Sequence, residues 1–220
     1  MSSPSYLSQR QFISALAGLM LCFIGSANTH VFAQTASAYP LETLLAEAAL
    51  PDEWQGAKDA PVTVIEYASM TCPHCAAFHA KTFPALKAQY IDTGKVRFVL
   101  REFPSDPLST AGFMLARCAG PNKREAMIDL LFAQQKNWVF TDKPFQGLSS
   151  LIKQTGMSQE SFESYLKDQA LYDKVNAVRE AGAKKFAVEA TPTFFINGKK
   201  ANGDMSIEDM GKLLAPFLKE

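Results

Sequence analysis

The sequence predicts an α/β protein in which two parts of one small sheet flank an inserted helical subdomain. A β-branched run at 62–69 precedes a helical segment from Pro73 and a second strand-like run at 95–103, which is the order of a βαβ unit. Strand signal is then weak until 193–198. Because a helical block of that length is not a loop, the predicted order is βαβ, an inserted helical subdomain, and ββα.

The first 33 residues have the layout of a secretory signal peptide. Arg10 is their only charged side chain, an apolar stretch covers 12–25, and Val31 and Ala33 occupy positions −3 and −1 of a cleavage site before Gln34. The apolar stretch is shorter than the roughly 20 residues that span a bilayer, which disfavours a membrane anchor. We therefore expect export to the periplasm, an oxidising compartment, with cleavage near Ala33.

Charge and cysteine content exclude two classes of protein. Lys plus Arg equals Asp plus Glu at 22 each, so no net charge attracts nucleic acid or a membrane surface. The chain has four cysteines, of which Cys22 lies in the signal segment. Three cysteines are too few to build a disulfide scaffold, so the core should rest on apolar packing.

The first part of the sheet belongs to a segment predicted at 57–106, after an N-terminal extension at 34–56. We expect the extension to be peripheral, with a short helix in "YPLETLLAEAAL". The helix that begins at Pro73 should kink at Pro84, because proline has no N–H to donate, and end at Gly94. The strands on either side of it should be parallel, with a right-handed crossover.

The inserted helical subdomain is predicted at 107–188, and the second part of the sheet at 189–220. Periodicity predicts helices at 108–119, 122–137, 145–155 and 159–186. In the last segment, Asn197-Gly198 predicts a tight hairpin. Ser206 and Asp209 predict a capping box before a closing amphipathic helix.

The motif "CPHC" has a spacing that metal sites, structural disulfides and redox centres can all use. Zinc usually needs four ligands, and only His74 and His79 accompany Cys72 and Cys75, so no metal is expected. A disulfide that closes so small a loop stabilises a fold little. Pro73 can start a helix there, whose N-terminus favours a thiolate, and His74 can add a positive charge or a hydrogen bond. The motif is therefore interpreted as a redox centre.

Two further features bear on this interpretation. Glu66 interrupts the apolar run "VTVIEYAS". It is either an exposed strand-face carboxylate or a buried one with a raised pKa that exchanges the proton of Cys75. Thr191-Pro192 opens the later strand as either an edge-strand proline or a cis-proline that positions its neighbours against the disulfide.

Taken together, "CPHC" after a hydrophobic strand, a helical insertion and "ATPTFFINGK" resemble the DsbA family of periplasmic thiol–disulfide oxidoreductases over most of 57–219. The resemblance implies a thioredoxin fold with an inserted helical subdomain. It implies donation of a disulfide to newly exported proteins, and reoxidation by a quinone-linked membrane partner of the DsbB type. It carries over the attacking thiol Cys72, the resolving thiol Cys75, the thiolate stabiliser His74, the buried carboxylate Glu66 and the cis-proline loop Thr191-Pro192. The Cys72–Cys75 disulfide is then the redox group, with no other cofactor.

The chain also departs from this family, and alternatives remain open. The prototype carries a lysine on its second strand near the buried carboxylate, and "VRFVLREF" shows no clear counterpart. Cys118 has no evident partner and is expected to be a buried small residue on a helix. Isomerases of the DsbC or DsbG kind use a separate dimerisation domain, and 34–56 is too short to supply one, so we expect a monomeric oxidase. A disulfide isomerase or reductase of the same superfamily, a cytochrome maturation factor and a non-catalytic chaperone-like binding module remain the alternatives.

Overall fold

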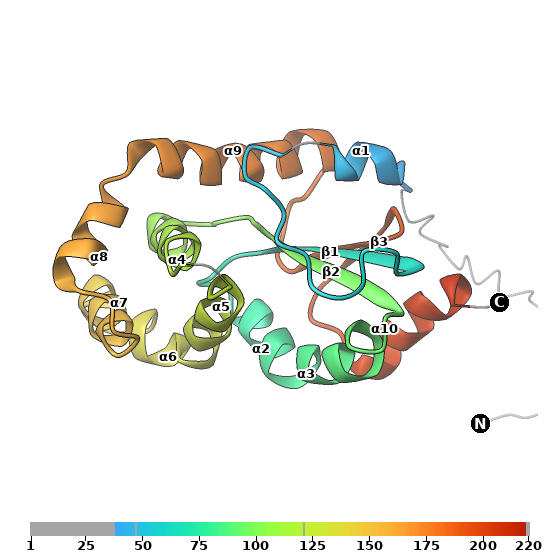
Figure 1. The fold of residues 1–220 in the computed structure, drawn as a ribbon, viewed down its shortest axis with the longest axis horizontal. Coiled ribbons are helices and arrows are strands. Elements are labelled where there is room, and N and C mark those ends of the chain that lie inside the picture. The colour runs from blue at the N-terminus through green and yellow to red at the C-terminus, as the bar shows by residue number, and fades with distance from the viewer. Residues whose placement is uncertain (1–37, 47, 121, 219–220) are drawn as a thin grey trace, which may run out of the picture. The chain divides into compact units, whose positions relative to one another are not determined.

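The computed structural model describes residues 38–46, 48–120 and 122–218, so the predicted signal segment 1–33 lies outside the described part of the chain. Within those ranges the elements follow the predicted order of βαβ, a run of helices and ββα (Figure 1). No helix of the described ranges is both long and apolar enough to cross a membrane. The predicted α/β class is confirmed.

A four-stranded sheet in the order β2-β1-β3-β4 lies at the centre. Its strands are β1 (Val62–Ala68), β2 (Val96–Glu102), β3 (Thr193–Ile196) and β4 (Lys199–Asn202). As predicted, β1 is parallel to β2, and β3 and β4 form an antiparallel hairpin; β3 also pairs antiparallel with β1, which the sequence analysis did not predict. Every residue of β1 is buried, as in a central strand covered on both faces, and this includes the polar Thr63 and Glu66.

Helices cover both faces of this sheet (Figure 1). One face carries α1 (Leu41–Leu45) and α9 (Gln169–Phe186), and the other carries α2 (Pro73–Lys81), α3 (Phe83–Leu86) and α10 (Ile207–Leu214). A 3₁₀ turn at Ala215–Phe217 follows α10. This arrangement buries β1 on both sides and places the start of α2 at the end of a rigid central strand.

The helix predicted from Pro73 is interrupted close to the predicted kink. It ends at Lys81 as α2, restarts at Phe83 as α3, and continues as a π-helical turn at Lys87–Ile91. Pro84 stands in the first turn of α3, where its missing N–H costs no hydrogen bond. Gly94, with φ +75°, turns the chain toward β2.

The helical segment contains α4 (Pro107–Arg117), α5 (Arg124–Ala133), α6 (Gln135–Trp138), α7 (Pro144–Lys153), α8 (Gln159–Leu166) and α9. Two segments were wrongly predicted as continuous helices. The 122–137 helix breaks at Gln134, between α5 and α6. The 159–186 helix breaks because Asp168 accepts a hydrogen bond from the backbone of Leu171 and thereby caps a new helix, α9.

The helix α9 belongs to the predicted insertion, yet it packs on the sheet. Gly182 lies so close to Tyr67 of β1 that an added Cβ would stand 2.8 Å from the ring. Phe186 at the end of α9 packs against the rings of Tyr39 and Phe195. The segment 107–188 therefore shares its core with the sheet.

The N-terminal extension is less peripheral than predicted. Its short helix is α1, whose Leu44 is fully buried. Backbone bridges join Ala38 to Lys199 and Gln55 to Phe98, so the extension pairs with both edge strands. The sequence does not predict this edge pairing, because the pairing depends on backbone N–H and C=O groups that the edge strands leave without partners.

The two local signals near the C-terminus agree with the structure. Asn197 and Gly198 have φ values of 43° and 88°, as a tight hairpin of this type requires. The Ser206 hydroxyl accepts a hydrogen bond from the Asp209 backbone N–H at 3.1 Å, so Ser206 caps α10. The loop between β4 and α10 contacts both ends of α2, through Asp204 at His74 and through the Met205 carbonyl, which accepts a hydrogen bond from the Thr82 hydroxyl.

Candidate redox site

The two cysteines of "CPHC" occupy different environments at the start of α2. Cys72 is the residue that precedes the helix, with extended backbone angles, and Pro73 is in its first turn. Cys72 is half-buried, whereas Cys75, one turn further in, is fully buried. Both thiols are free, so the structure describes the reduced state.

The surroundings of Cys72 stabilise its thiolate. A hydrogen bond from the Cys75 thiol is the largest effect, and burial opposes it. A hydrogen bond from the Thr191 side chain and the backbone N–H groups of Cys75 and His74 add to the stabilisation. Together they lower the pKa of Cys72 to about 5, so this thiol is ionised at neutral pH and is a ready nucleophile.

The surroundings of Cys75 have the opposite effect. Burial raises the pKa of its thiol far above the ordinary value, and the neighbouring charges of Glu66 and Cys72 raise it further. Glu66 is fully buried on β1, so the alternative of an exposed strand-face carboxylate is wrong. Cys75 therefore holds its proton at neutral pH, and a group must deliver or remove that proton whenever the disulfide opens or closes.

His74 is exposed, and the described contact of its imidazole is with Asp204 rather than with the sulfur of Cys72. Nδ1 of His74 lies 3.1 Å from Oδ1 of Asp204, which belongs to the loop that follows β4. Toward Cys72, His74 contributes its backbone N–H. That the imidazole also stabilises the thiolate stays a prediction.

The Thr191–Pro192 loop lies directly beside the attacking sulfur. The peptide bond between these two residues is cis. The thiol of Cys72 donates a hydrogen bond to the Thr191 carbonyl oxygen across 3.2 Å, although 119 positions separate them. This carbonyl can hold only the protonated form, so the bond is lost when the thiolate forms.

Two groups that the sequence analysis did not single out hold the loop before α2. The side-chain amide of Gln135 donates to the carbonyls of Met70 and Cys72, at 2.9 and 3.0 Å. The Ser109 hydroxyl accepts from the Met70 N–H, and Asp106 caps α4 by accepting from the Ser109 N–H. Asp106 before a proline is a pattern that predicts the start of a helix, but no sequence signal indicates the role of Gln135.

The partner of Glu66 was also missed. His79 Nε2 lies 2.9 Å from Glu66 Oε2, and both side chains are buried. The sequence analysis found no lysine on β2 to serve this carboxylate, and the cation comes instead from the helix α2. Of the cations on β2, Arg101 pairs with Asp52.

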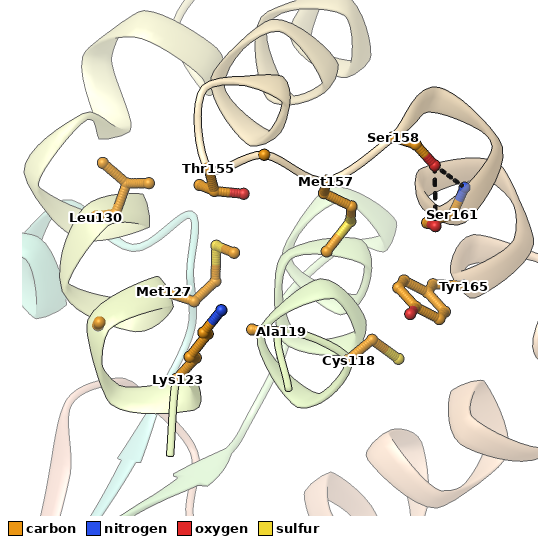
Figure 2. A pocket seen from close by; sticks show the side chains of 12 residues that line it. Cys118, Ala119, Lys123, Met127, Leu130, Thr155, Met157, Ser158, Ser161 and Tyr165 are labelled. Atoms are coloured by element: carbon orange, nitrogen blue, oxygen red, sulfur yellow. Dashed lines mark hydrogen bonds between the residues drawn. The ribbon is translucent and has the colours of Figure 1, made fainter. Parts of the chain in front are cut away.

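A separate groove of about 640 Å³ lies between α5 and the segments at the end of α4 and the start of α8 (Figure 2). Cys118 lines it, together with Met127, Met157 and Tyr165. Cys118 is half-buried at the C-cap of α4, so the expectation of a buried residue on a helix was wrong as to its burial. Burial and the charge of Asp168 raise the pKa of its thiol, which makes it a poor nucleophile at neutral pH.

In the described ranges, no three His, Cys, Asp or Glu side chains form a cluster able to hold an ion. The pair Cys72 and Cys75 with the Glu66–His79 pair behind it instead has the parts of a thiol–disulfide exchange centre: a nucleophile, a second thiol, and groups that can move a proton.

Comparison with known proteins places these features in context. The family model described as thioredoxin matches residues 49–215. A "Putative protein-disulfide oxidoreductase" of Rickettsia conorii is 35% identical over 170 residues, which cover 75% of this chain and 60% of that protein. A "Probable disulfide bond formation protein D" of Bacillus cereus is 28% identical, covering 75% of this chain and 78% of that one.

Solved structures give the same picture. The crystal structure of α-DsbA1 from Wolbachia pipientis superposes with a TM-score of 0.73 at 27% identity, covering 81% of this chain and 96% of that one. The chain thus spans nearly all of this structure, but only about 60% of the length of the Rickettsia conorii relative.

Proposed function

Since this chain belongs to the thioredoxin family and is similar to its DsbA members, we propose that it is a thiol–disulfide oxidoreductase that donates a Cys72–Cys75 disulfide to other proteins. One observation carries the proposal, namely the different surroundings of the two thiols: Cys72 is half-buried at the start of α2, and Cys75 is fully buried one turn inside. The pKa of Cys72 is about 5, while that of Cys75 is raised. An ionised outer thiol and a protonated inner one divide the roles of attack and resolution between them.

The exchange proceeds in two displacements. A substrate thiolate attacks the sulfur of Cys72, the Cys72–Cys75 bond breaks, and Cys75 leaves and takes up a proton. A second substrate thiolate then attacks the substrate sulfur of the mixed disulfide, and Cys72 leaves as a thiolate. Two substrate thiols are oxidised to a disulfide, and the enzyme disulfide is reduced to two thiols. Because its pKa is low, Cys72 is a good leaving group in this last step.

The difference between the two thiols also determines whether the protein oxidises or reduces its substrates. Stabilising the thiolate of Cys72 stabilises only the reduced protein, so the disulfide form becomes a stronger oxidant. A tenfold change in the exchange equilibrium corresponds to about 30 mV for this two-electron couple. The low pKa therefore favours an oxidase over a reductase.

The substrate backbone is proposed to lie along the Thr191–Pro192 loop. The Thr191 carbonyl is 3.2 Å from the Cys72 sulfur, so a strand paired with residue 191 would bring its own cysteine to the point of attack. Substrates are proposed to be newly exported, cysteine-containing proteins, which arrive unfolded and can present an extended segment.

The cellular setting is part of the proposal. The N-terminal sequence predicts export to the periplasm with cleavage near Ala33. Reoxidation would then require a membrane quinone reductase of the DsbB type that accepts the two electrons from Cys72 and Cys75. We propose that the exported protein works as a monomer.

Trapping of mixed disulfides tests the function and the roles together. Cys75→Ala should accumulate substrates on Cys72, because no second thiol resolves them, while Cys72→Ala should accumulate none. Pro192→Thr in the otherwise native chain should lengthen the life of the adducts. Non-reducing gels of cell extracts report all three. Substrates held on Cys75 in the Cys72→Ala protein would overturn the assignment.

Titration of the thiolate absorbance separates the enzyme from a chaperone-like binding module, which has no reason to hold Cys72 ionised. A midpoint near 5 supports the oxidase, and a midpoint near that of a free thiol supports the binding module. Mass spectrometry of protein recovered from the periplasm tests the export signal, since an intact Met1 would contradict cleavage.

A further inference from the structure

The buried carboxylate behind the cysteines has an unusual partner. His79 Nε2 lies 2.9 Å from Glu66 Oε2, with side chains 4% and 0% exposed. Among the described residues, neither the other oxygen of Glu66 nor Nδ1 of His79 has a hydrogen-bond partner. Glu66 also raises the pKa of Cys75, so this one carboxylate acts on both the inner thiol and the imidazole.

The far side of the imidazole reaches toward solvent. Nδ1 of His79 lies 3.9 Å from Oδ1 of Asp129, whose side chain is 52% exposed. That distance is too long for a direct hydrogen bond but suits one water or a small rotation of the exposed carboxylate. His79 and Asp129 also line two cavities of about 340 and 330 Å³, each large enough for water. Neither Glu66 nor Cys75 lines them.

The charges around His79 favour its protonated form. Burial opposes the charge, but the carboxylates of Glu66 and Asp129 outweigh it and raise the pKa of His79 to about 9. The ring stacks on Phe132 with centroids 4.5 Å apart, which also suits a cation. The charged groups around it are Glu66 of β1, Arg124, Glu125 and Asp129 of α5, Lys87 of the π-helical turn and Glu53 of the extension.

We propose that His79 supplies and removes the proton of Cys75, working through Glu66 and exchanging that proton with solvent beside Asp129. This inference rests on the proposed oxidoreductase function and adds the route by which its buried thiol is protonated. His79 is not assigned contact with either sulfur, so it acts on Cys75 only by way of the carboxylate.

The transfer balances during disulfide donation. When a substrate thiolate displaces Cys75, Glu66 passes a proton from the imidazolium of His79 to the departing sulfur. The products of this transfer are the Cys75 thiol and a neutral imidazole, and Glu66 ends in the charge state in which it began. The imidazole then takes a proton from water beside Asp129. Reoxidation runs the same route in reverse, and the two electrons move only in the disulfide exchange.

The first test replaces His79 with glutamine, which keeps an N–H donor for Glu66 but has no proton to transfer. The reaction measured is the attack of glutathione on the oxidised protein, with the rate constant expressed per glutathione thiolate. For the wild-type protein it should be constant between pH 6 and 8 and fall above the pKa of His79. H79Q should be slower by about tenfold or more, because a positioned acid typically contributes at least that much.

A matched pair of surface variants keeps the test independent of the folding of H79Q. Asp129→Asn removes a negative charge beside Nδ1 and should lower the pKa of His79, so the fall in rate should begin at lower pH. Asp92→Asn removes an equal charge from an exposed carboxylate that pairs with Lys87 instead, and should leave the pH profile unchanged. NMR titration of the His79 ring in each protein gives its pKa directly.

The outcomes separate the two proposals. A wild-type protein that does not oxidise a dithiol peptide would defeat the oxidoreductase function itself. An active wild-type protein whose pH profile is shared by H79Q and by Asp129→Asn would defeat the relay alone. In every variant the thiolate absorbance of Cys72 should titrate as in the wild type, because His79 acts on the other thiol.

Discussion

Oxidation of the Cys72–Cys75 pair should change the stability of the fold in a direction that depends on pH. Below about pH 6 the oxidised form should be the more stable of the two, and above about pH 7 the reduced form. The perturbation is a single bond between two thiols that the structure already brings together at the start of α2. Two opposing contributions decide which form is favoured.

The first contribution comes from the thiolate, which exists only in the reduced protein. Folding lowers the pKa of Cys72 from 9.0 to about 5. A depressed acid pKa stabilises the fold fully above the unfolded value and not at all below the folded one. Between those limits the contribution grows by about 1.4 kcal/mol per pH unit, so it is about 2.7 kcal/mol at pH 7 and about 4 kcal/mol at pH 8.

The second contribution comes from the disulfide, which constrains the unfolded chain. For so short a loop the chain-entropy relation predicts about 1.9 kcal/mol in favour of the oxidised form, independent of pH. The reduced form should then be favoured by about 2 kcal/mol at pH 8, and the oxidised form by about 1.5 kcal/mol at pH 5. Because Cys72 is only half-buried, solvent screening weakens the thiolate contribution and moves the crossover to higher pH.

Urea unfolding of both forms at pH 5, 6, 7 and 8 measures these differences. Reduced Cys72→Ala serves as the control, because it lacks the thiolate and should lose the rise in stability between pH 5 and 8. An oxidised protein that is still the more stable at pH 8, or a difference between the two forms that does not change with pH, would refute the reasoning.

Three further predictions follow from individual contacts. Asp204→Asn frees the His74 imidazole from its carboxylate partner and should raise the reduction potential if the imidazole stabilises the thiolate, whereas an unchanged potential leaves the tuning to the helix terminus. Gly182→Ala should destabilise by about 1 kcal/mol in thermal unfolding despite the better helix propensity of alanine, because its Cβ would stand 2.8 Å from Tyr67; a rise in melting temperature would contradict this. Glu102→Gln should cost about 3 kcal/mol in urea unfolding, because it leaves the buried Arg117 and Arg124 side chains with only the half-exposed Glu53 as an anion, and a neutral result would show that Glu53 alone satisfies them.

Much of the site could be predicted from the sequence because its features are local. Pro73 after a β-branched strand predicts a helix start, and that alone places Cys72 at a helix N-terminus with Cys75 one turn inside. Asn197-Gly198 predicts the hairpin that joins β3 to β4, since few residues accept the backbone angles it needs. In each case neighbouring residues determine the backbone, so no distant contact is required.

What the tertiary structure decided depends on residues far apart in the chain. The sequence is compatible with either an exposed or a buried carboxylate at position 66. Only packing against α2 settles its burial and its pairing with His79. The same holds for the Thr191 carbonyl beside Cys72 and for Asp204, which holds the His74 imidazole. Burial and long-range pairing set the pKa values of such groups, and neither is written in the local pattern of residues, because desolvation depends on the complete fold.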